Sequence, residues 1–135
     1  MVAPRFLLDT NILSYAIKDP KGSVNHHLQS LSGADICTSI IVACELRYGV
    51  AKKGSRQLAD KVESILNNIR VLPLDEDVSQ HYADIRYQLE KEGKVIGQNN
   101  LLIAAHARSG GMTVVTNNER EFARVGGLKV ENWLR

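Results

Sequence analysis

The segment Arg5-Phe6-Leu7-Leu8-Asp9-Thr10-Asn11 sets the architecture expected for the rest of the chain. Its three large hydrophobic residues are too few for a helix, and Asp-Thr-Asn ends the run, a pattern typical of a strand buried on both faces of a parallel sheet. Asp9 would then lie at the carboxyl end of that strand, the edge of open α/β sheets where ligands bind. A carboxylate there is either the N-cap of the next helix or part of a functional site.

The composition fits one globular domain spanning residues 1–135. Of these 135 residues, 44% are hydrophobic, which is enough to close a single core. The 17 basic and 15 acidic residues leave a formal net charge of +2, far from the strong excess of a protein that coats nucleic acid non-specifically. Any polyanion would therefore be bound locally.

The cysteines and the hydropathy pattern bear on location. Cys37 and Cys44 have apolar neighbours and no second pair, and no signal-like segment precedes Phe6, so we expect a reduced, cytoplasmic protein. No apolar run approaches the ~20 residues needed to cross a bilayer, so no membrane role is expected.

Strand-like and helix-like hydrophobic spacing alternates along the chain. Further strands are expected at 35–39, 71–74, 112–116 and 129–131, and Pro73 makes the second of these an edge or terminating strand. Helices are expected over 12–17, 24–31, 40–52, 58–69 and 78–89, with a nearly all-apolar central helix over 101–107 and a short helix or turn at 117–122. This order predicts an α/β fold, a three-layer α/β/α domain with a mainly parallel central sheet.

Two of the expected helices begin beside short polar residues that favour N-caps. Thr10 or Asn11 can cap the helix after the first strand, and Asn99 or Asn100 is placed to start the central helix. Both predictions concern residues that also lie near the expected ligand-binding edge.

Polar residues from distant parts of the chain should meet at that edge. Asp9 follows the first strand, Glu45 lies in the first helical turns after the second, Asn100 opens the central helix, and the segment 116–121 follows the next buried strand. Crowded carboxylates repel one another unless a cation separates them, and hard oxygen ligands suit Mg²⁺ or Mn²⁺. The chemistry indicated is metal-assisted phosphodiester hydrolysis.

Five segments, in this order, closely resemble the PIN-domain toxins of the VapC type. They are Leu7-Leu8-Asp9-Thr10-Asn11, Glu45-Leu46-Arg47-Tyr48-Gly49, Ile96-Gly97 ahead of Leu101-Leu102-Ile103-Ala104-Ala105-His106-Ala107, Val115-Thr116-Asn117-Asn118 with Arg120-Glu121-Phe122, and Val130-Glu131-Asn132-Trp133-Leu134. The resemblance covers nearly the whole chain.

What the resemblance implies is a PIN-like domain that acts as a magnesium-dependent endoribonuclease, with Mn²⁺ as a second possible ion. Such a protein is the toxin of a bacterial type II toxin-antitoxin pair and cuts structured RNA such as tRNA. The resemblance also implies a homodimer, silenced by a small VapB-type antitoxin whose C-terminal segment enters the active-site groove. The antitoxin, and not this chain, would supply the part that binds operator DNA.

By the same resemblance, Asp9 matches the first metal-holding aspartate of the family and Glu45 its glutamate. Asn100 stands where the family has its next aspartate, at the second metal-holding position, and this is the main departure. A carboxamide keeps the shape of the side chain but removes a full negative charge and leaves one neutral oxygen for the cation. Metal affinity and water activation should both fall.

The segment after the fourth expected strand supplies the remaining candidates. Thr116 and Asn118 can hydrogen-bond in the site as supporting residues, while Glu121 or Glu119 could supply the remaining acid. We rank Glu121 ahead of Glu119.

Simpler structural roles compete with these catalytic ones. Asp9 and Asn100 are both good helix N-caps, and a cap needs only the side-chain oxygen. Glu45 could be a partly buried acid paired with Arg47 or another base, since an isolated buried acid is costly. His106, in an apolar helix, is expected to be a hydrogen-bonded structural histidine and not a general base or ligand.

A basic cluster on the helix after the second strand is a secondary candidate for RNA binding. It contains Arg47, Lys52 and Lys53, with Arg56 nearby, but such clusters are more often solvated helix faces.

The leading hypothesis is the ribonuclease toxin, weakened or silenced here by Asn100, and the alternative is a catalytically inactive PIN domain that binds RNA or antitoxin. A flavodoxin-like phosphotransfer domain is a distant third, because no lysine lies opposite a phosphate-accepting aspartate.

Overall fold

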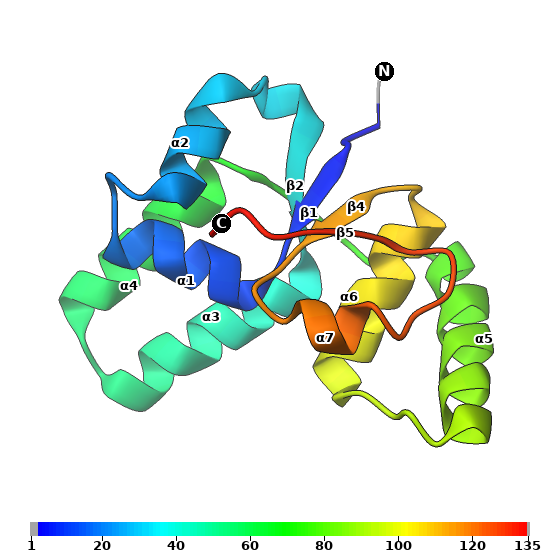
Figure 1. The fold of residues 1–135 in the computed structure, drawn as a ribbon. Helices are drawn as coiled ribbons and strands as arrows, with labels where there is room; N and C mark the ends of the chain where they lie inside the picture. The colour runs from blue at the N-terminus through cyan, green and yellow to red at the C-terminus, as the bar shows by residue number, and fades with distance from the viewer. Residues whose placement is uncertain (1–2, 135) are drawn as a thin grey trace.

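A parallel five-stranded sheet forms the middle of the computed structural model, which describes residues 3–134 (Figure 1). The strands, in the order β3-β2-β1-β4-β5, are β1 Phe6–Leu8, β2 Ile36–Ser39, β3 Arg70–Leu72, β4 Thr113–Val115 and β5 Lys129–Glu131. The helices are α1 Thr10–Lys18, α2 Ser23–Ser30, α3 Ile40–Lys53, α4 Arg56–Asn67, α5 Glu76–Glu92, α6 Gln98–Ser109 and α7 Glu119–Phe122, with a 3₁₀ turn at Gly33–Asp35. The predicted three-layer α/β/α fold is confirmed, and every strand pairing in it is parallel.

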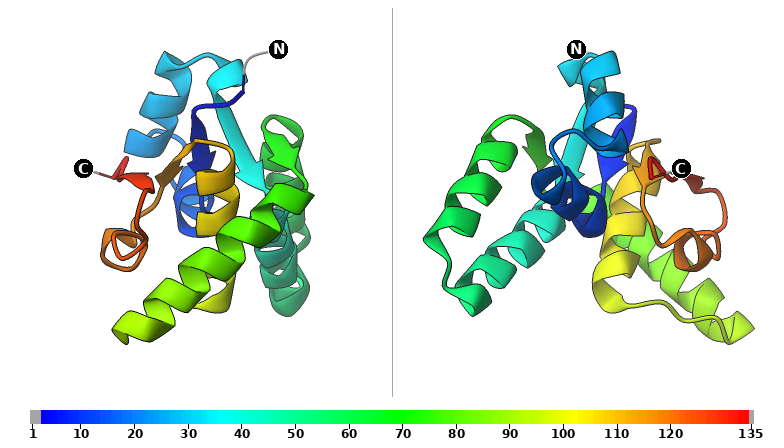
Figure 2. Two further views of the ribbon diagram at one scale, coloured as in Figure 1. Left: turned by 90° about the vertical axis from the view of Figure 1, so that its right-hand side faces the viewer. Right: turned by 60° about the vertical axis from the view of Figure 1, so that its left-hand side comes forward.

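The helices divide into two layers. Helices α1 to α4 lie on one side of the sheet and α5, α6 and α7 on the other (Figure 2). This follows from right-handed crossovers, because the chain moves in one direction from β1 to β3 and in the other from β3 to β5. Within residues 3–134, no helix has both the length and the apolar character needed to span a bilayer.

Strand β1 occupies the centre of the sheet, as its sequence predicts. All three of its residues are buried, and Leu8 pairs with Thr38 of β2 on one side and Val115 of β4 on the other. The Thr38 hydroxyl donates to the Leu8 carbonyl at 2.7 Å, and the Asp9 amide donates to the Val115 carbonyl at 3.0 Å. Asp9 is therefore fixed at the carboxyl edge of the innermost strand.

Two further sequence predictions hold in the layers around this strand. Strand β3 lies at the edge of the sheet and ends at Leu72, before Pro73 removes a backbone donor. Helix α6 is buried through the apolar run that starts at Leu101, and His106 within it is a hydrogen-bonded structural residue, with Nδ1 2.8 Å from the hydroxyl oxygen of Ser39.

Of the N-caps considered for the first helix, the structure confirms Asp9 and contradicts Thr10 and Asn11, and the N-cap expected for the central helix is wrong. Asp9, and not Thr10 or Asn11, caps α1, because its backbone is extended and its Oδ1 accepts from the Ile12 amide at 3.0 Å. Helix α6 begins earlier than expected, after Gly97, and has no side-chain cap.

The two cysteines are free but differ in environment. Cys37 is buried in β2 with its Sγ 3.4 Å from the sulfur of Met112, and burial raises the pKa of its thiol to about 12. Cys44 is exposed on α3, so the apolar surroundings expected for both cysteines hold only for Cys37.

Candidate active site at the carboxyl edge of the sheet

Asp9 combines a structural contact with an unfavourable environment for its charge. Only 4% of the residue is exposed. Burial raises the pKa of its carboxyl, and the nearby charge of Glu45 acts in the same direction, while hydrogen bonds from the side chain of Thr116 and the amide of Ile12 oppose the shift. A carboxylate whose charge is disfavoured by burial and by a neighbouring negative charge is stabilised when it binds a cation or a proton.

Glu45 lies beside Asp9 because α3 starts at the same edge. Ser39 caps this helix by accepting from the Ile41 amide at 3.1 Å, and Glu45 follows in the second turn, half-buried. The Thr10 hydroxyl donates to Glu45 Oε1 at 2.5 Å. The alternative in which Glu45 pairs with Arg47 is wrong.

Arg47 points to the other side of α3 and is engaged there. Its guanidinium makes two hydrogen bonds of 2.9 Å to the carboxylate of Glu63 on α4. Arg47 therefore contributes little free positive charge toward a substrate.

Glu121 forms the opposite wall of the site. Its Oε1 accepts from the Gly97 amide at 2.6 Å and from Asn100 Nδ2 at 3.2 Å, and its Oε2 accepts from Asn118 Nδ2 at 3.0 Å. Desolvation would raise the pKa of Glu121, but these three donors and the charge of Arg124 outweigh it and lower the pKa. Glu121 is thus held as a carboxylate by amide donors.

Asn100 is the third residue of α6 and does not act as a helix cap. Its amide nitrogen faces Glu121, which leaves Oδ1 as the atom free to face a ligand. An aspartate at this position would place a second negative charge against Glu121.

Thr116 connects the two walls. It hydrogen-bonds the carboxyl of Asp9 with its side chain, and its Oγ1 accepts from the Asn118 amide at 2.9 Å. The structure therefore brings most of the predicted site residues into one continuous set. We call it the acidic set, and it runs through Glu45, Thr10, Asp9, Thr116, Asn118, Glu121 and Asn100. One half of the set comes from the layer of α1 and α3, the other from the layer of α6 and α7.

Glu119 makes a hydrogen bond to a residue outside this set. Its Oε1 accepts from Asn132 Nδ2 at 3.0 Å, a contact with the segment after β5. Two groups that the sequence did not assign to the site make hydrogen bonds in it. They are the hydroxyl of Thr10 and the backbone amide of Gly97. A threonine directly after an edge aspartate was a usable signal for the first, whereas a backbone amide leaves no signal in the residue type.

Comparisons with known proteins agree with this geometry. A family model described as the PIN domain matches residues 6–128. The chain belongs to the PIN domain family. This PIN domain is 40% identical over 131 residues to a tRNA(fMet)-specific endonuclease VapC from Shigella flexneri, covering 96% of this chain and 98% of the relative. It is 39% identical to a ribonuclease VapC2 from Rickettsia felis over 130 residues, covering 95% and 97% of the two chains.

Solved structures give the same result for the fold. A VapBC2 complex from Rickettsia felis bound to a DNA fragment from its promoter matches with a TM-score of 0.87 and 38% identity, covering 95% of this PIN domain and 98% of that chain. A DNA-bound VapBC from Salmonella typhimurium matches with a TM-score of 0.89 and 34% identity, covering 96% and 98%. The resemblance to VapC-type toxins is therefore confirmed.

The donors in the site of this PIN domain are of the kind that Mg²⁺ prefers. Asp9 and Glu45 supply carboxylate oxygens and Asn100 a carboxamide oxygen, and Mg²⁺ in enzymes is often held by only one or two carboxylates with several waters. Within residues 3–134, no three His, Cys, Asp or Glu side chains gather as a set that could hold a metal ion. The site thus fits the ion in donor type but is poorer in charge than three carboxylates would be.

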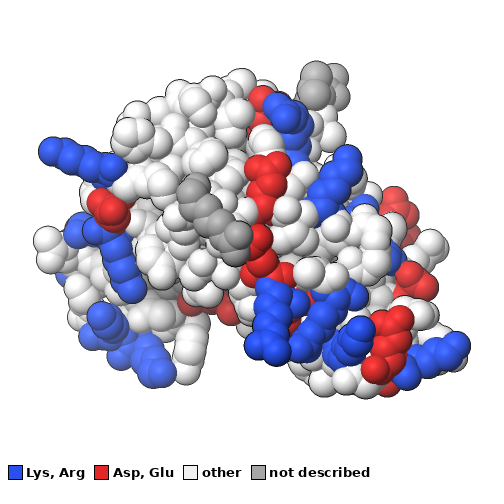
Figure 3. Space-filling model, in the orientation of Figure 1, with Lys and Arg blue, Asp and Glu red and all other residues white. Residues whose placement is uncertain are grey.

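Positive charge flanks the site of this PIN domain. Figure 3 shows the molecule hollowed between α3 and α7, with lysine and arginine side chains on either side. The exposed residues Lys52, Lys53 and Arg56 lie on the α3–α4 side, and Arg120 and Arg124 on the α7 side. The formal net charge of +2 is thus distributed so that basic groups lie around an acidic centre.

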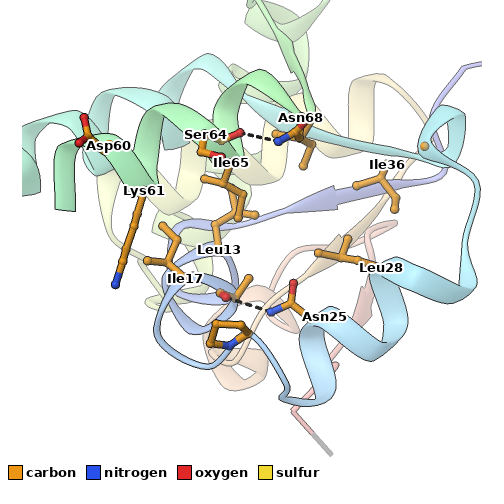
Figure 4. Close-up of a pocket in the computed structure, with 14 residues that line it drawn as sticks. Leu13, Ile17, Asn25, Leu28, Ile36, Asp60, Lys61, Ser64, Ile65 and Asn68 are labelled. Atoms are coloured by element: carbon orange, nitrogen blue, oxygen red, sulfur yellow. Dashed lines mark hydrogen bonds between the residues drawn. The ribbon is translucent and has the colours of Figure 1, made fainter. Parts of the chain in front are cut away.

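A second concavity of this PIN domain is apolar. A groove of about 640 Å³ lies between α1, α2 and α4 (Figure 4). Its floor is aliphatic and includes Leu13, Ile17 and Ile65, while Asn25 and Lys61 lie among its polar lining residues. It contains none of the residues of the acidic set and so is a separate surface.

Proposed function

We propose that this chain is the toxin of a type II toxin-antitoxin pair and an endoribonuclease that hydrolyses phosphodiester bonds of structured RNA such as tRNA with Mg²⁺ or Mn²⁺. The observation that supports it most is the position of Asp9 near the charge of Glu45, which accepts a hydrogen bond from Thr10, at the edge of the central strand in a PIN domain. Its curated relatives include ribonucleases, one of them specific for tRNA(fMet). RNA and a bacterial antitoxin are both cytoplasmic, which is where we place the activity.

In the proposed mechanism, Asp9, Glu45 and Asn100 would hold the ion. When bound, the ion neutralises phosphate charge and makes a water molecule more acidic. Thr10 fixes Glu45 through Oε1, which leaves Oε2 as the atom that accepts a proton or orients a water. Glu121, held ionised by its three N–H donors, keeps negative charge at the far wall and orients the amide of Asn100.

Asn100 should limit this activity. It provides one neutral oxygen where a carboxylate would provide two charged ones, so both metal affinity and water activation should be low. We expect Asn100→Asp to increase RNA cleavage by at least about tenfold, since each 1.4 kcal/mol of transition-state stabilisation is a factor of ten.

The test compares this chain with Asn100→Asp on total RNA, with Mg²⁺ and with EDTA. The double variant Asp9→Asn, Asn100→Asp is the control, which should be inactive. Equal cleavage by the two forms would show that position 100 does not contribute to metal binding. RNA or antitoxin binding without cleavage by either form, at any Mg²⁺ or Mn²⁺ concentration, would favour the alternative of an inactive binding module, which the missing third carboxylate supports.

The partners we propose are a VapB-type antitoxin, the RNA substrate and a second copy of this chain in a homodimer. The support is that two solved relatives, with 38% and 34% identity, are VapBC complexes bound to DNA, the first of them to a promoter fragment. We place the antitoxin on the apolar groove between α1, α2 and α4, because an open aliphatic surface of this size needs a partner to exclude water. Contact with operator DNA would come only through the antitoxin.

A further inference from the structure

One side of α3 carries a carboxylate, an aromatic ring and a lysine in succession, starting at the acidic set. Helix α3 turns once in 3.6 residues, so Glu45, Tyr48 and Lys52 lie within about 60° of one another around its axis. Tyr48 is about 4.5 Å and Lys52 about 10.5 Å further along the helix than Glu45. We call these three residues the α3 track.

Tyr48 exposes a large aromatic side chain to solvent. Its relative exposure is 67%, the largest of any large hydrophobic side chain in the described part of the chain. Among residues 3–134 its ring packs on no other aromatic ring or cation, and its hydroxyl makes no hydrogen bond. No contact within the described structure therefore requires a tyrosine at this position.

The charges around α3 distinguish the track from the opposite side of the helix. Arg47, about 160° away from Glu45 around the axis, is neutralised by the carboxylate of Glu63. Lys52 is exposed, and no carboxylate of residues 3–134 forms an ion pair with it. The positive charge of Lys52 on the track is thus not neutralised, whereas the charge of Arg47 is.

We propose that Tyr48 is a stacking platform for an unpaired base of the RNA substrate next to the bond that is cut, and that Lys52 binds a backbone phosphate one turn further along α3. This rests on the proposed function, since it assumes that the scissile phosphate lies at Asp9 and Glu45. Bases in single-stranded loops of folded RNA are free to stack on aromatic side chains, whereas the bases of a duplex are not. The α3 track therefore selects unpaired nucleotides in a structured RNA and does so with little preference for base identity.

The test measures binding of a short, fluorescently labelled single-stranded RNA of mixed sequence, and of the same RNA annealed to its complement, in EDTA so that no cleavage occurs. Tyr48→Ala should weaken binding of the single strand by about five- to a hundredfold, the range for losing one stacked base. Tyr48→Phe should bind like the parent protein, because the ring is kept. Tyr87→Ala is the matched control, since Tyr87 is 64% exposed on α5 and far from the track.

Two further measurements make the result specific to stacking. An abasic nucleotide is placed at successive positions of the single-stranded RNA. At one position it should weaken binding to the parent protein, and at that same position it should not weaken binding to Tyr48→Ala. Lys52→Gln should lower the slope of log affinity against log salt by about 1, as expected for losing one phosphate contact.

Three outcomes would overturn the proposal. Tyr48→Ala could bind single-stranded RNA like the parent, or Tyr48→Phe could behave like Tyr48→Ala, which would make the hydroxyl and not the ring important. Light scattering could also show that Tyr48→Ala converts a dimer into monomers whose RNA affinity is unchanged, which would make the track a contact between copies. If neither the parent nor Asn100→Asp binds or cleaves RNA, the proposed function fails as well, whereas cleavage that is insensitive to Tyr48 overturns only this inference.

Discussion

Asp9 serves the fold and the candidate site with the same carboxylate. One oxygen caps α1 by accepting from the Ile12 amide, and burial leaves the charge poorly solvated. Burial raises the pKa of this carboxyl, so the folded protein binds the proton more tightly than the unfolded chain. The resulting gain in stability is complete below the ordinary pKa of 3.8 and is lost as the pH rises through the folded pKa.

We predict that Asp9→Asn raises the melting temperature at pH 7 while it abolishes activity. Asparagine caps a helix as well as aspartate, and it removes a buried charge that costs free energy at neutral pH. In the Asn100→Asp background, cleavage should fall by at least about 10²-fold, equivalent to about 2.7 kcal/mol of transition-state stabilisation, because Asp9 would hold the ion. Thermal melts between pH 3.5 and 7 should show the stability difference shrinking as the pH falls, and a constant difference would contradict the role assigned to this charge.

Between elements, one buried hydrogen bond joins the two helices that carry Glu45 and Asn100. His106 of α6 lies 2.8 Å from the hydroxyl of Ser39, and Ser39 caps α3. Burial lowers the pKa of His106, and the charge of Asp75 only partly opposes this. The folded state therefore binds the proton more weakly than the unfolded chain, and stability declines as the pH falls from about 6.5 through the folded pKa.

We predict that His106→Ala and Ser39→Ala each cost about 1–3 kcal/mol in the free energy of unfolding, because each leaves a buried polar partner unsatisfied. The double variant should cost less than the sum of the two. Urea denaturation at pH 8 and pH 5 measures both effects, and His106→Ala should also lose the part of the pH dependence that comes from this histidine. If the double variant loses the sum of the two single losses in unfolding free energy, and His106→Ala leaves the pH dependence unchanged, His106 and Ser39 do not stabilise the fold through their contact.

The aliphatic groove on the other side of α1 gives a prediction about the antitoxin. Ile17→Glu would place a charge on the floor of the groove, and we expect it to weaken antitoxin binding by at least about tenfold, as for a residue near the centre of an interface. Pull-down titration with the antitoxin measures this, with Tyr87→Ala on α5 as the control and thermal melting as a check on folding. If Ile17→Glu binds antitoxin as the parent does, the antitoxin does not occupy this groove.

For the whole molecule, the order of elements was predictable because hydrophobic runs of different period alternate along the chain, and Phe6-Leu7-Leu8 has the pattern of a doubly buried strand. The edge position of Asp9, Glu45 and Glu121 followed from that order. The helix caps did not, because Asp9, Thr10 and Asn11 are all good capping residues and only the backbone conformation of Asp9 decides among them. The contact of the Gly97 amide with Glu121 was also out of reach, because a backbone amide leaves no signal in the residue type.

The division of the acidic set between two layers has a consequence for how the protein is made. Asp9, Thr10 and Glu45 lie within the first 45 residues, whereas Thr116, Asn118 and Glu121 are translated much later, and strand β4 must pair with β1 before Thr116 reaches Asp9. A nascent chain, or one truncated before β4, therefore has only half of the site and no strand to bring in the other half. If the chain is the nuclease proposed above, RNA cleavage requires the segment from β4 onward to be made and paired with β1, so a chain truncated before β4 should not cleave RNA.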